Sequence, residues 1–301
     1  MSLLLVVAVV AAAGYAVYRE RHTFSTAYQQ LGPGLLVASF FCGLAGVGVT
    51  WLGWRQVLLG LDVDLPWEAG ARVFFVSQLG KYLPGSVWPA LMQMEEGRAH
   101  GASRRTMLGA NVITVALGCA MGLIVACVLL PLYDLEVLRS YWWVLLALPV
   151  LLVLLHPRTL PALLDRAFRL LRRPPLGERL DLRREVLASS WMLTSWILLG
   201  LEVGVLAGGL ARGHGSVSVY LLSIGGMALA ATAGLLFIPA PAGAGIRDVV
   251  LGLVLSTVMK AGTAVVVVIT SRALLTAADL ALAGLAATAH RLVAARSAAS
   301  S

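Results

Sequence analysis

The chain has 301 residues, of which 59% are hydrophobic and only 13% are charged, and its mean hydropathy is +0.87. Soluble domains carry about 25% charged residues, so this chain lacks the polar surface that a globule in water needs. With a net charge of +8, the composition excludes a soluble enzyme, a disordered chain and a disulfide scaffold. Cys42, Cys119 and Cys127 all lie in apolar runs and predict neither disulfides nor a metal site.

Seven apolar runs approach or reach the roughly 20 residues that a helix needs to cross a bilayer. The first run ends at Arg19, and we expect it to be a retained helix because no basic side chain precedes it; a cleaved signal peptide is the alternative. The runs predict an all-α, polytopic integral membrane protein with about 7–8 transmembrane helices. They cover residues 2–18, 34–59, 107–130, 141–155, 186–211, 217–238 and 263–289.

Two further segments, residues 69–96 and 239–260, fit a membrane span poorly. In the first, apolar stretches flank the polar sequence QLGKYLPG at residues 78–85, where Pro84 and Gly85 interrupt the helix. The second opens with PAPAGAG at residues 239–245. Unpaired peptide groups at membrane depth are costly unless protein or a water-filled cavity satisfies them. Two broken or re-entrant segments, one in each half of the chain, therefore predict a transporter-like binding site.

A basic loop at residues 156–185 contains eight arginines between two apolar runs, which predicts a cytoplasmic location under the positive-inside rule. Within it, residues 159–173 predict an interfacial amphipathic helix, either a topology signal alone or a recruiter of anionic lipid. If residues 69–96 are re-entrant, the N-terminus is cytoplasmic. The C-terminus is cytoplasmic if residues 239–260 add a further crossing.

Ionisable side chains inside the apolar runs need a function or a partner, because each costs about 2.5–3.5 kcal/mol at the bilayer centre on insertion scales. Arg272 and Asp279 lie seven residues apart on one helical face, too far to pair with each other. We expect Arg272 to bind a lipid phosphate or Asp248, and a purely structural salt bridge is the alternative. Lys81 and Arg247 lie beside the two interruptions.

The glycines at residues 243 and 245 precede a helix predicted to begin near residue 246. Its free amides, its dipole and Arg247 favour an anion there. Alternatively, Arg247 pairs with Asp248 or another acid, and the glycines only permit close packing. Glu202 is an isolated carboxylate within an apolar run. Three roles fit it: it binds a cationic head group, it carries a proton in coupled transport, or it pairs with Arg272. Asn111 is interpreted as an interhelical hydrogen bond.

Four pieces of the sequence resemble the flippase-like transmembrane family of lysylphosphatidylglycerol synthases. These pieces are FFVSQLGKYLPG at residues 74–85, the turn at residues 98–101, PAPAGAGIRD at residues 239–248, and Arg272. The resemblance covers nearly the whole chain by order and spacing, and it identifies a stand-alone relative without the synthase domain. The chain differs at Asp248, where glutamate is usual, and at residues 87–90, which replace a Gly-Asp stretch.

The resemblance implies one transmembrane flippase-like domain over residues 1–301, in a bacterial cell inner (cytoplasmic) membrane. It implies movement of lipids, such as aminoacyl phospholipids or polyprenyl-linked sugars, between leaflets. The candidate substrate-binding residues are Gln78, Lys81, Tyr82, Pro84, Gly85, Arg98, Glu202, Pro241, Gly243, Gly245, Arg247, Asp248, Arg272 and Asp279.

We expect no catalytic residue, metal or cofactor, and the chain has no P-loop that would indicate ATP drive. The expected partners are membrane lipids, either an anionic phospholipid or a polyprenyl-linked lipid, and not nucleic acid. A second copy, a synthase or a glycosyltransferase is a further candidate partner. Two alternatives stay open: a membrane enzyme that uses Glu202 or Asp248 as a base on a lipid-linked substrate, and a non-transporting protein that holds a glycosyltransferase or synthase at the membrane.

Overall fold

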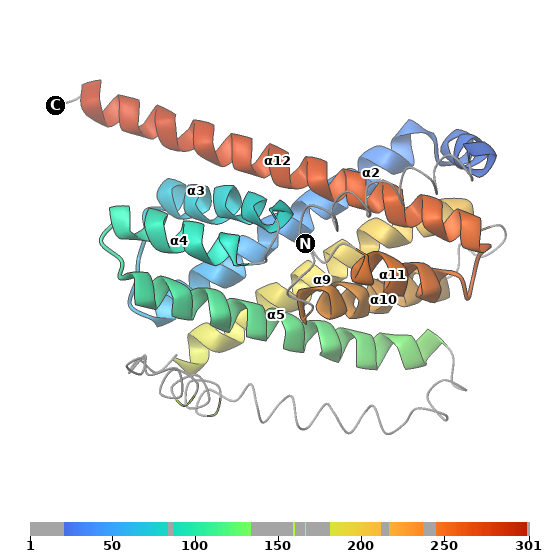
Figure 1. Ribbon diagram of the computed structural model, residues 1–301, viewed down its shortest axis with the longest axis horizontal. Helices are drawn as coiled ribbons and strands as arrows, with labels where there is room; N and C mark the ends of the chain where they lie inside the picture. The colour runs from blue at the N-terminus through green and yellow to red at the C-terminus, as the bar shows by residue number, and fades with distance from the viewer. Residues whose placement is uncertain are drawn as a thin grey trace.

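The computed structural model describes residues 21–83, 87–133, 181–211, 217–236 and 245–299, with residues 159 and 166 as isolated positions. Within these ranges the chain is helical and contains no strand (Figure 1). The predicted runs at 2–18 and 141–155, and most of the basic loop at 156–185, lie outside the described residues.

Five long apolar helices confirm the five predicted spans that fall within the described ranges. Even the shortest has 20 residues, about 30 Å of helix, which matches the hydrocarbon thickness of a bilayer. The fold is therefore an all-α polytopic membrane protein. The five helices are α2 (Arg21–Gly60), α5 (Arg104–Tyr133), α9 (Leu182–Leu210), α10 (Val217–Leu236) and α12 (Ala261–Ala299).

The first of these helices, α2, bends at Gly32 and Pro33. Gly32 has a φ of +61°, which side-chain-bearing residues rarely adopt, and Pro33 has no backbone N–H to donate. The predicted run therefore begins directly after the bend. Beyond it α2 packs along α9, where the hydroxyls of Thr50 and Ser195 lie 2.8 Å apart.

Short helices replace full spans in both predicted broken segments. In the first, α3 (Trp67–Gln78) and α4 (Trp88–Ala99) have 12 residues each, about 18 Å, and the 3₁₀ helix η1 (Leu79–Tyr82) follows α3 directly. In the second, α11 (Ile246–Leu255) has 10 residues, about 15 Å. None of these helices can cross a hydrocarbon core of about 30 Å, which confirms that both segments are interrupted.

The helices α3 and α4 form a hairpin that enters the bundle from one end (Figure 1). Arg72 of α3 donates to both carboxylate oxygens of Glu96 on α4, at 2.9 and 3.2 Å. At the base of the hairpin, Arg55 pairs with Asp64 at 3.0 Å and lies 5.1 Å from the centre of the Trp67 ring. These contacts fix the base, so the interruption at η1 points into the bundle.

The helices α10 and α11 form a second hairpin, which enters from the opposite end (Figure 1). Gly225 in the first half of α10 packs against Leu130 near the end of α5, whereas Thr232 packs against Gly122 in the middle of α5. Val254 of α11 returns beside the first half of α10. The chain then enters α12 from this end, and α12 runs towards the end from which α3 and α4 enter.

Basic residues concentrate at the end from which α3 and α4 enter. Two contacts bring separate elements together there: the rings of His100, after α4, and His290, on α12, are 6.2 Å apart, and Arg184 at the start of α9 donates to Gln56 of α2 at 2.9 Å. We call this the basic end. Its arginines are Arg55, Arg72, Arg98, Arg104, Arg105, Arg183, Arg184, Arg291 and Arg296.

Candidate functional site

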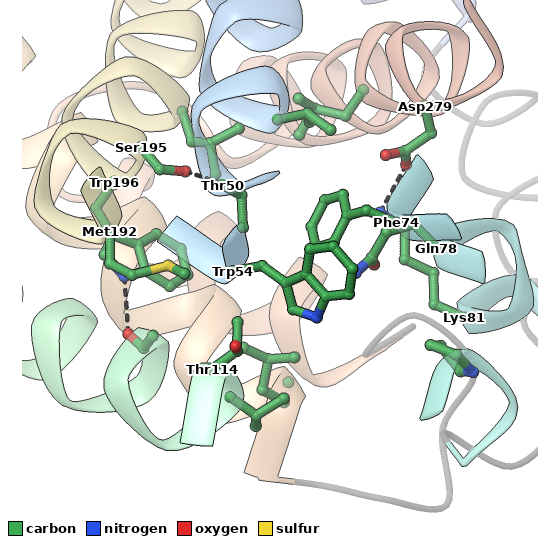
Figure 2. Close-up of a pocket in the computed structure, with 18 of the residues that line it drawn as sticks. Thr50, Trp54, Phe74, Gln78, Lys81, Thr114, Met192, Ser195, Trp196 and Asp279 are labelled. Atoms are coloured by element: carbon green, nitrogen blue, oxygen red, sulfur yellow. Dashed lines mark hydrogen bonds and ion pairs between the residues drawn. The ribbon is translucent and has the colours of Figure 1, made fainter. Parts of the chain in front are cut away.

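A cavity of about 300 Å³ lies where the two hairpins meet, and every helix of the described ranges contributes to its wall (Figure 2). Large apolar side chains form much of that wall, among them Trp54, Phe74 and Trp196. We call this cavity the chamber. Its charged lining residues are Lys81 from the first broken segment, Arg247 from the second, and Arg272 and Asp279 from α12.

The first broken segment is tied to α12 through the carboxylate of Asp279. Lys81 Nζ lies 2.7 Å from Asp279 Oδ2, and the Tyr82 hydroxyl donates to the same oxygen at 2.5 Å. The Asp279 side chain is 2% exposed, whereas that of Lys81 is 31% exposed. Asp279 therefore has its partners on a distant segment, as expected from its separation from Arg272, and its second oxygen, Oδ1, has no hydrogen-bond partner among the described residues.

The second broken segment is tied to α12 through Asp248. Arg272 Nη1 donates to Asp248 Oδ2 at 2.6 Å, so Asp248 is the partner seen of the two expected for this arginine. The same oxygen accepts the backbone N–H of Gly245 at 3.2 Å. Gly245 has a φ of +91°, and α11 starts at the next residue, as predicted. Asp248 thus caps the start of α11 with its own carboxylate and joins it to α12.

Arg247 is the chamber cation for which the structure records no ion pair within the described ranges. Its Nε is buried and has no hydrogen-bond partner among the described residues. The alternative pairing with Asp248 is not seen, since that carboxylate binds Arg272. An unpartnered guanidinium beside an interruption of the backbone is suited to an anionic oxygen, because its planar fork can make two parallel hydrogen bonds.

Glu202 lies behind the chamber wall and does not line the cavity. It is 0% exposed, and its carboxylate accepts hydrogen bonds from Ser39 at 3.4 Å and from Ser271 at 2.8 Å. The predicted alternative pair with Arg272 is wrong, because Arg272 binds Asp248. Glu202 joins α2, α9 and α12 through neutral hydroxyl donors.

A polar cluster that the sequence reasoning missed lies on the chamber wall nearer the basic end. The side-chain oxygen of Gln93 accepts hydrogen bonds from Trp54 Nε1 at 3.2 Å and from Asn111 Nδ2 at 3.1 Å. Asn111 therefore makes the predicted interhelical hydrogen bond. The one feature of the sequence that could have singled out Gln93 is that it is a lone amide in the short apolar stretch after the first interruption.

The remaining candidate residues divide into three groups. Gln78 lines the chamber. Arg98 is exposed at the end of α4 and does not line the chamber. The other candidates lie outside the described residues, and they are Pro84, Gly85, Pro241 and Gly243.

The fold and the site define a multi-pass helical membrane protein with a cation-rich chamber between two interrupted segments. The chain belongs to the family described as the lysylphosphatidylglycerol synthase TM region, whose model matches residues 2–283. This is a membrane family linked to lipid modification or flipping. No curated protein and no solved structure matches the chain.

Proposed function

We propose that this protein moves an anionic phospholipid, or another lipid-linked phosphate, between the leaflets of a bilayer. The observation that carries the proposal is the charge of the chamber: three cations and one carboxylate line it, between two interrupted segments. The phosphate docks among Lys81, Arg247 and Arg272 while the acyl tails remain in the bilayer. No covalent chemistry is required.

The ion pairs of the chamber suit transient binding better than permanent binding. Lys81 and Arg272 already have carboxylate partners, at 2.7 and 2.6 Å, so a lipid phosphate must compete with Asp279 and Asp248 for them. Arg247 lacks such a competitor among the described residues. The phosphate meets Arg247 first and is released when the carboxylates re-form their pairs. A transporter needs binding strong enough for entry and weak enough for release.

The two hairpins supply a route on each side of the chamber. Each hairpin contacts α12 through one ion pair. The α12 members of these pairs, Asp279 and Arg272, lie seven residues apart, about 10 Å along the helix. Moving the α3–α4 hairpin breaks the Lys81–Asp279 pair and opens the basic end. Moving the α10–α11 hairpin breaks the Arg272–Asp248 pair and opens the opposite end. Rocking of the hairpins in turn gives alternating access.

The distribution of arginines favours a cytoplasmic basic end in a bacterial inner membrane. Because α12 ends there, the C-terminus is cytoplasmic in this orientation. The helix α2 begins at the other end, so the span that the sequence predicts over residues 2–18, which lies outside the described residues, would place the N-terminus in the cytoplasm as well.

Transport is favoured over the enzyme alternative by the placement of the acids. A membrane enzyme that used Glu202 or Asp248 as a base needs that carboxylate free beside the substrate. Glu202 lies outside the chamber lining, and Asp248 is bound to Arg272 and Gly245. Neither is placed to take a proton from a lipid in the chamber.

Transport assays in proteoliposomes test the proposal. Vesicles that contain fluorescent phosphatidylglycerol are treated with an impermeant quencher, and the rate at which inner-leaflet label becomes accessible is compared with that of protein-free vesicles. We expect the parent to accelerate this exchange, and Arg247→Gln and Arg272→Gln to slow it at least tenfold. The matched control is Arg105→Gln, an exposed arginine at the basic end that does not line the chamber. If both chamber variants exchange lipid as fast as the parent, the proposal is wrong.

A further inference from the structure

The amide of Gln93 is oriented by two donors on its oxygen. Trp54 Nε1 can only donate, so the atom 3.2 Å from it is the amide oxygen, and Asn111 donates to the same atom at 3.1 Å. The amide nitrogen, with two hydrogens, is thereby turned to the other side. Gln93 is 0% exposed and lines the chamber, yet this nitrogen has no hydrogen-bond partner among the described residues.

A second unpartnered donor lies close by on α5. Thr114, one turn after Asn111, is 8% exposed, lines the chamber, and has a hydroxyl without a hydrogen-bond partner among the described residues. Threonines elsewhere on the chamber wall behave differently: Thr50 and Thr276 donate to the carbonyl four residues earlier, at 3.0 and 2.8 Å. The hydrogen-bonding capacity of the buried Thr114 hydroxyl is thus unused among the described residues.

Unpartnered polar groups that are this well buried are unusual, because leaving a buried donor unsatisfied costs folding free energy. Two of them belong to residues that line one cavity, and Asp279 Oδ1 is an unpartnered acceptor on a third lining residue. Figure 2 shows the Trp54 indole in the middle of this region, between Thr114 and Asp279. Donors, an acceptor and an aromatic face are therefore grouped at one part of the chamber.

We propose that Gln93 and Thr114 form a subsite for an uncharged, hydroxyl-bearing head group, such as glycerol or a sugar, joined to the lipid phosphate. This inference rests on the proposed function, since it names the head group that the same chamber accepts. The Gln93 amide donates to a head-group hydroxyl oxygen, and Thr114 donates to another or accepts from it. Asp279 Oδ1 accepts a hydroxyl hydrogen. The carbon skeleton of the head group lies against the Trp54 indole.

A cationic head group fits this chamber less well. Asp279 is the only carboxylate among the described lining residues, and Lys81 lies 2.7 Å from it. An ammonium group placed there meets Lys81, Arg247 and Arg272 before it meets an unpaired acid. A neutral hydroxyl can accept from the unpartnered amide nitrogen of Gln93, whereas an ammonium cannot, because it has no acceptor atom.

Binding of two matched short-chain lipids to the full chain in detergent tests the inference. Dihexanoyl phosphatidylglycerol and dihexanoyl phosphatidylethanol carry the same charge, and the glycerol lipid has two further head-group hydroxyls and one further carbon. Their affinities are measured by displacement of a fluorescent lipid. We expect the parent to bind the glycerol lipid about tenfold more tightly, a ratio that two ordinary hydrogen bonds supply. Thr114→Val should reduce the preference about threefold, and Gln93→Leu should do the same, while affinity for the ethanol lipid stays constant.

The control is Thr194→Val, which removes an exposed hydroxyl of α9 that bonds its own helix and should keep the full preference. Unchanged affinity for the ethanol lipid shows that each variant is folded. The inference is overturned if the parent does not discriminate between the two lipids, or if Thr114→Val retains the whole preference. Selective binding without lipid exchange in vesicles contradicts the proposed transport but not the subsite. If both lipids exchange between leaflets in vesicles and bind in detergent with equal affinity, the subsite is contradicted but the proposed transport is not.

Discussion

The ion pair between Lys81 and Asp279 should contribute to stability far more than an exposed pair does. The perturbation is a double-mutant cycle of Lys81→Met, Asp279→Asn and the double variant. The carboxylate is 2% exposed and the ammonium is 31% exposed, with 2.7 Å between them. Exposed pairs couple by about 0.2–1 kcal/mol, and breaking a fully buried pair costs about 3–5 kcal/mol. A half-buried pair lies between these limits, so we expect a coupling energy of about 1–2.5 kcal/mol.

The assay is equilibrium unfolding in mixed micelles, followed by intrinsic tryptophan fluorescence, with the free energy of unfolding compared across the four proteins. Arg104 and Glu95 provide the matched control cycle, since this pair has nearly the same distance, 2.8 Å, with both side chains more than half exposed. We expect its coupling to be close to the detection limit. Equal coupling in the two cycles would refute the reasoning, because it would mean that Asp279 is not shielded from water.

Three further predictions follow from single positions. Glu202→Leu should lower the free energy of unfolding by about 1–3 kcal/mol because it leaves the buried Ser271 hydroxyl unpaired, while Ser39 keeps its bond to the backbone carbonyl of residue 202; Glu202→Gln should lower it less; unfolding in mixed micelles distinguishes them. Gly200→Ala places a Cβ directly against Ile224 Cα and should force α9 and α10 apart with a large loss of folded yield, whereas Gly48→Ala meets nothing within 4 Å and should be tolerated; size-exclusion profiles in detergent report this, and equal yields would contradict it. Asp248→Asn should weaken the bond from Arg272 and raise the affinity for phosphatidylglycerol severalfold, because one competitor for the guanidinium loses its charge; lipid displacement measures it, and weaker binding would contradict it.

The spans and their interruptions were predictable because both depend on local composition. A run of apolar residues must lie in lipid, and a polar or Pro/Gly-rich centre cannot continue a helix there. The start of α11 after Gly245 follows from the same local rules, and so does the need of Arg272 for a partner. The Arg272–Asp248 pair was one of two stated options and links residues only 24 positions apart.

The other half of the site depends on packing between distant segments, which local patterns do not encode. Tyr82 and Asp279 are separated by 197 positions, and their contact exists because the α3–α4 hairpin packs against α12. Gln93 was missed for a related reason: a single amide in a short apolar helix carries no periodic signal. Its role appears only once Trp54 and Asn111 are seen to hold its oxygen.

The central claim is that the two interruptions enclose a water-filled chamber, and cysteine accessibility in proteoliposomes tests it most directly. In a protein whose three native cysteines are replaced by alanine, Thr276→Cys puts a thiol on the chamber wall, and Ala277→Cys puts one on the exposed, lipid-facing side of α12. We expect a charged, lipid-insoluble thiol reagent to modify Thr276→Cys, phosphatidylglycerol to slow this reaction, and Ala277→Cys to stay unmodified. An unreactive thiol at position 276, or equal reactivity at both positions, would contradict the claim.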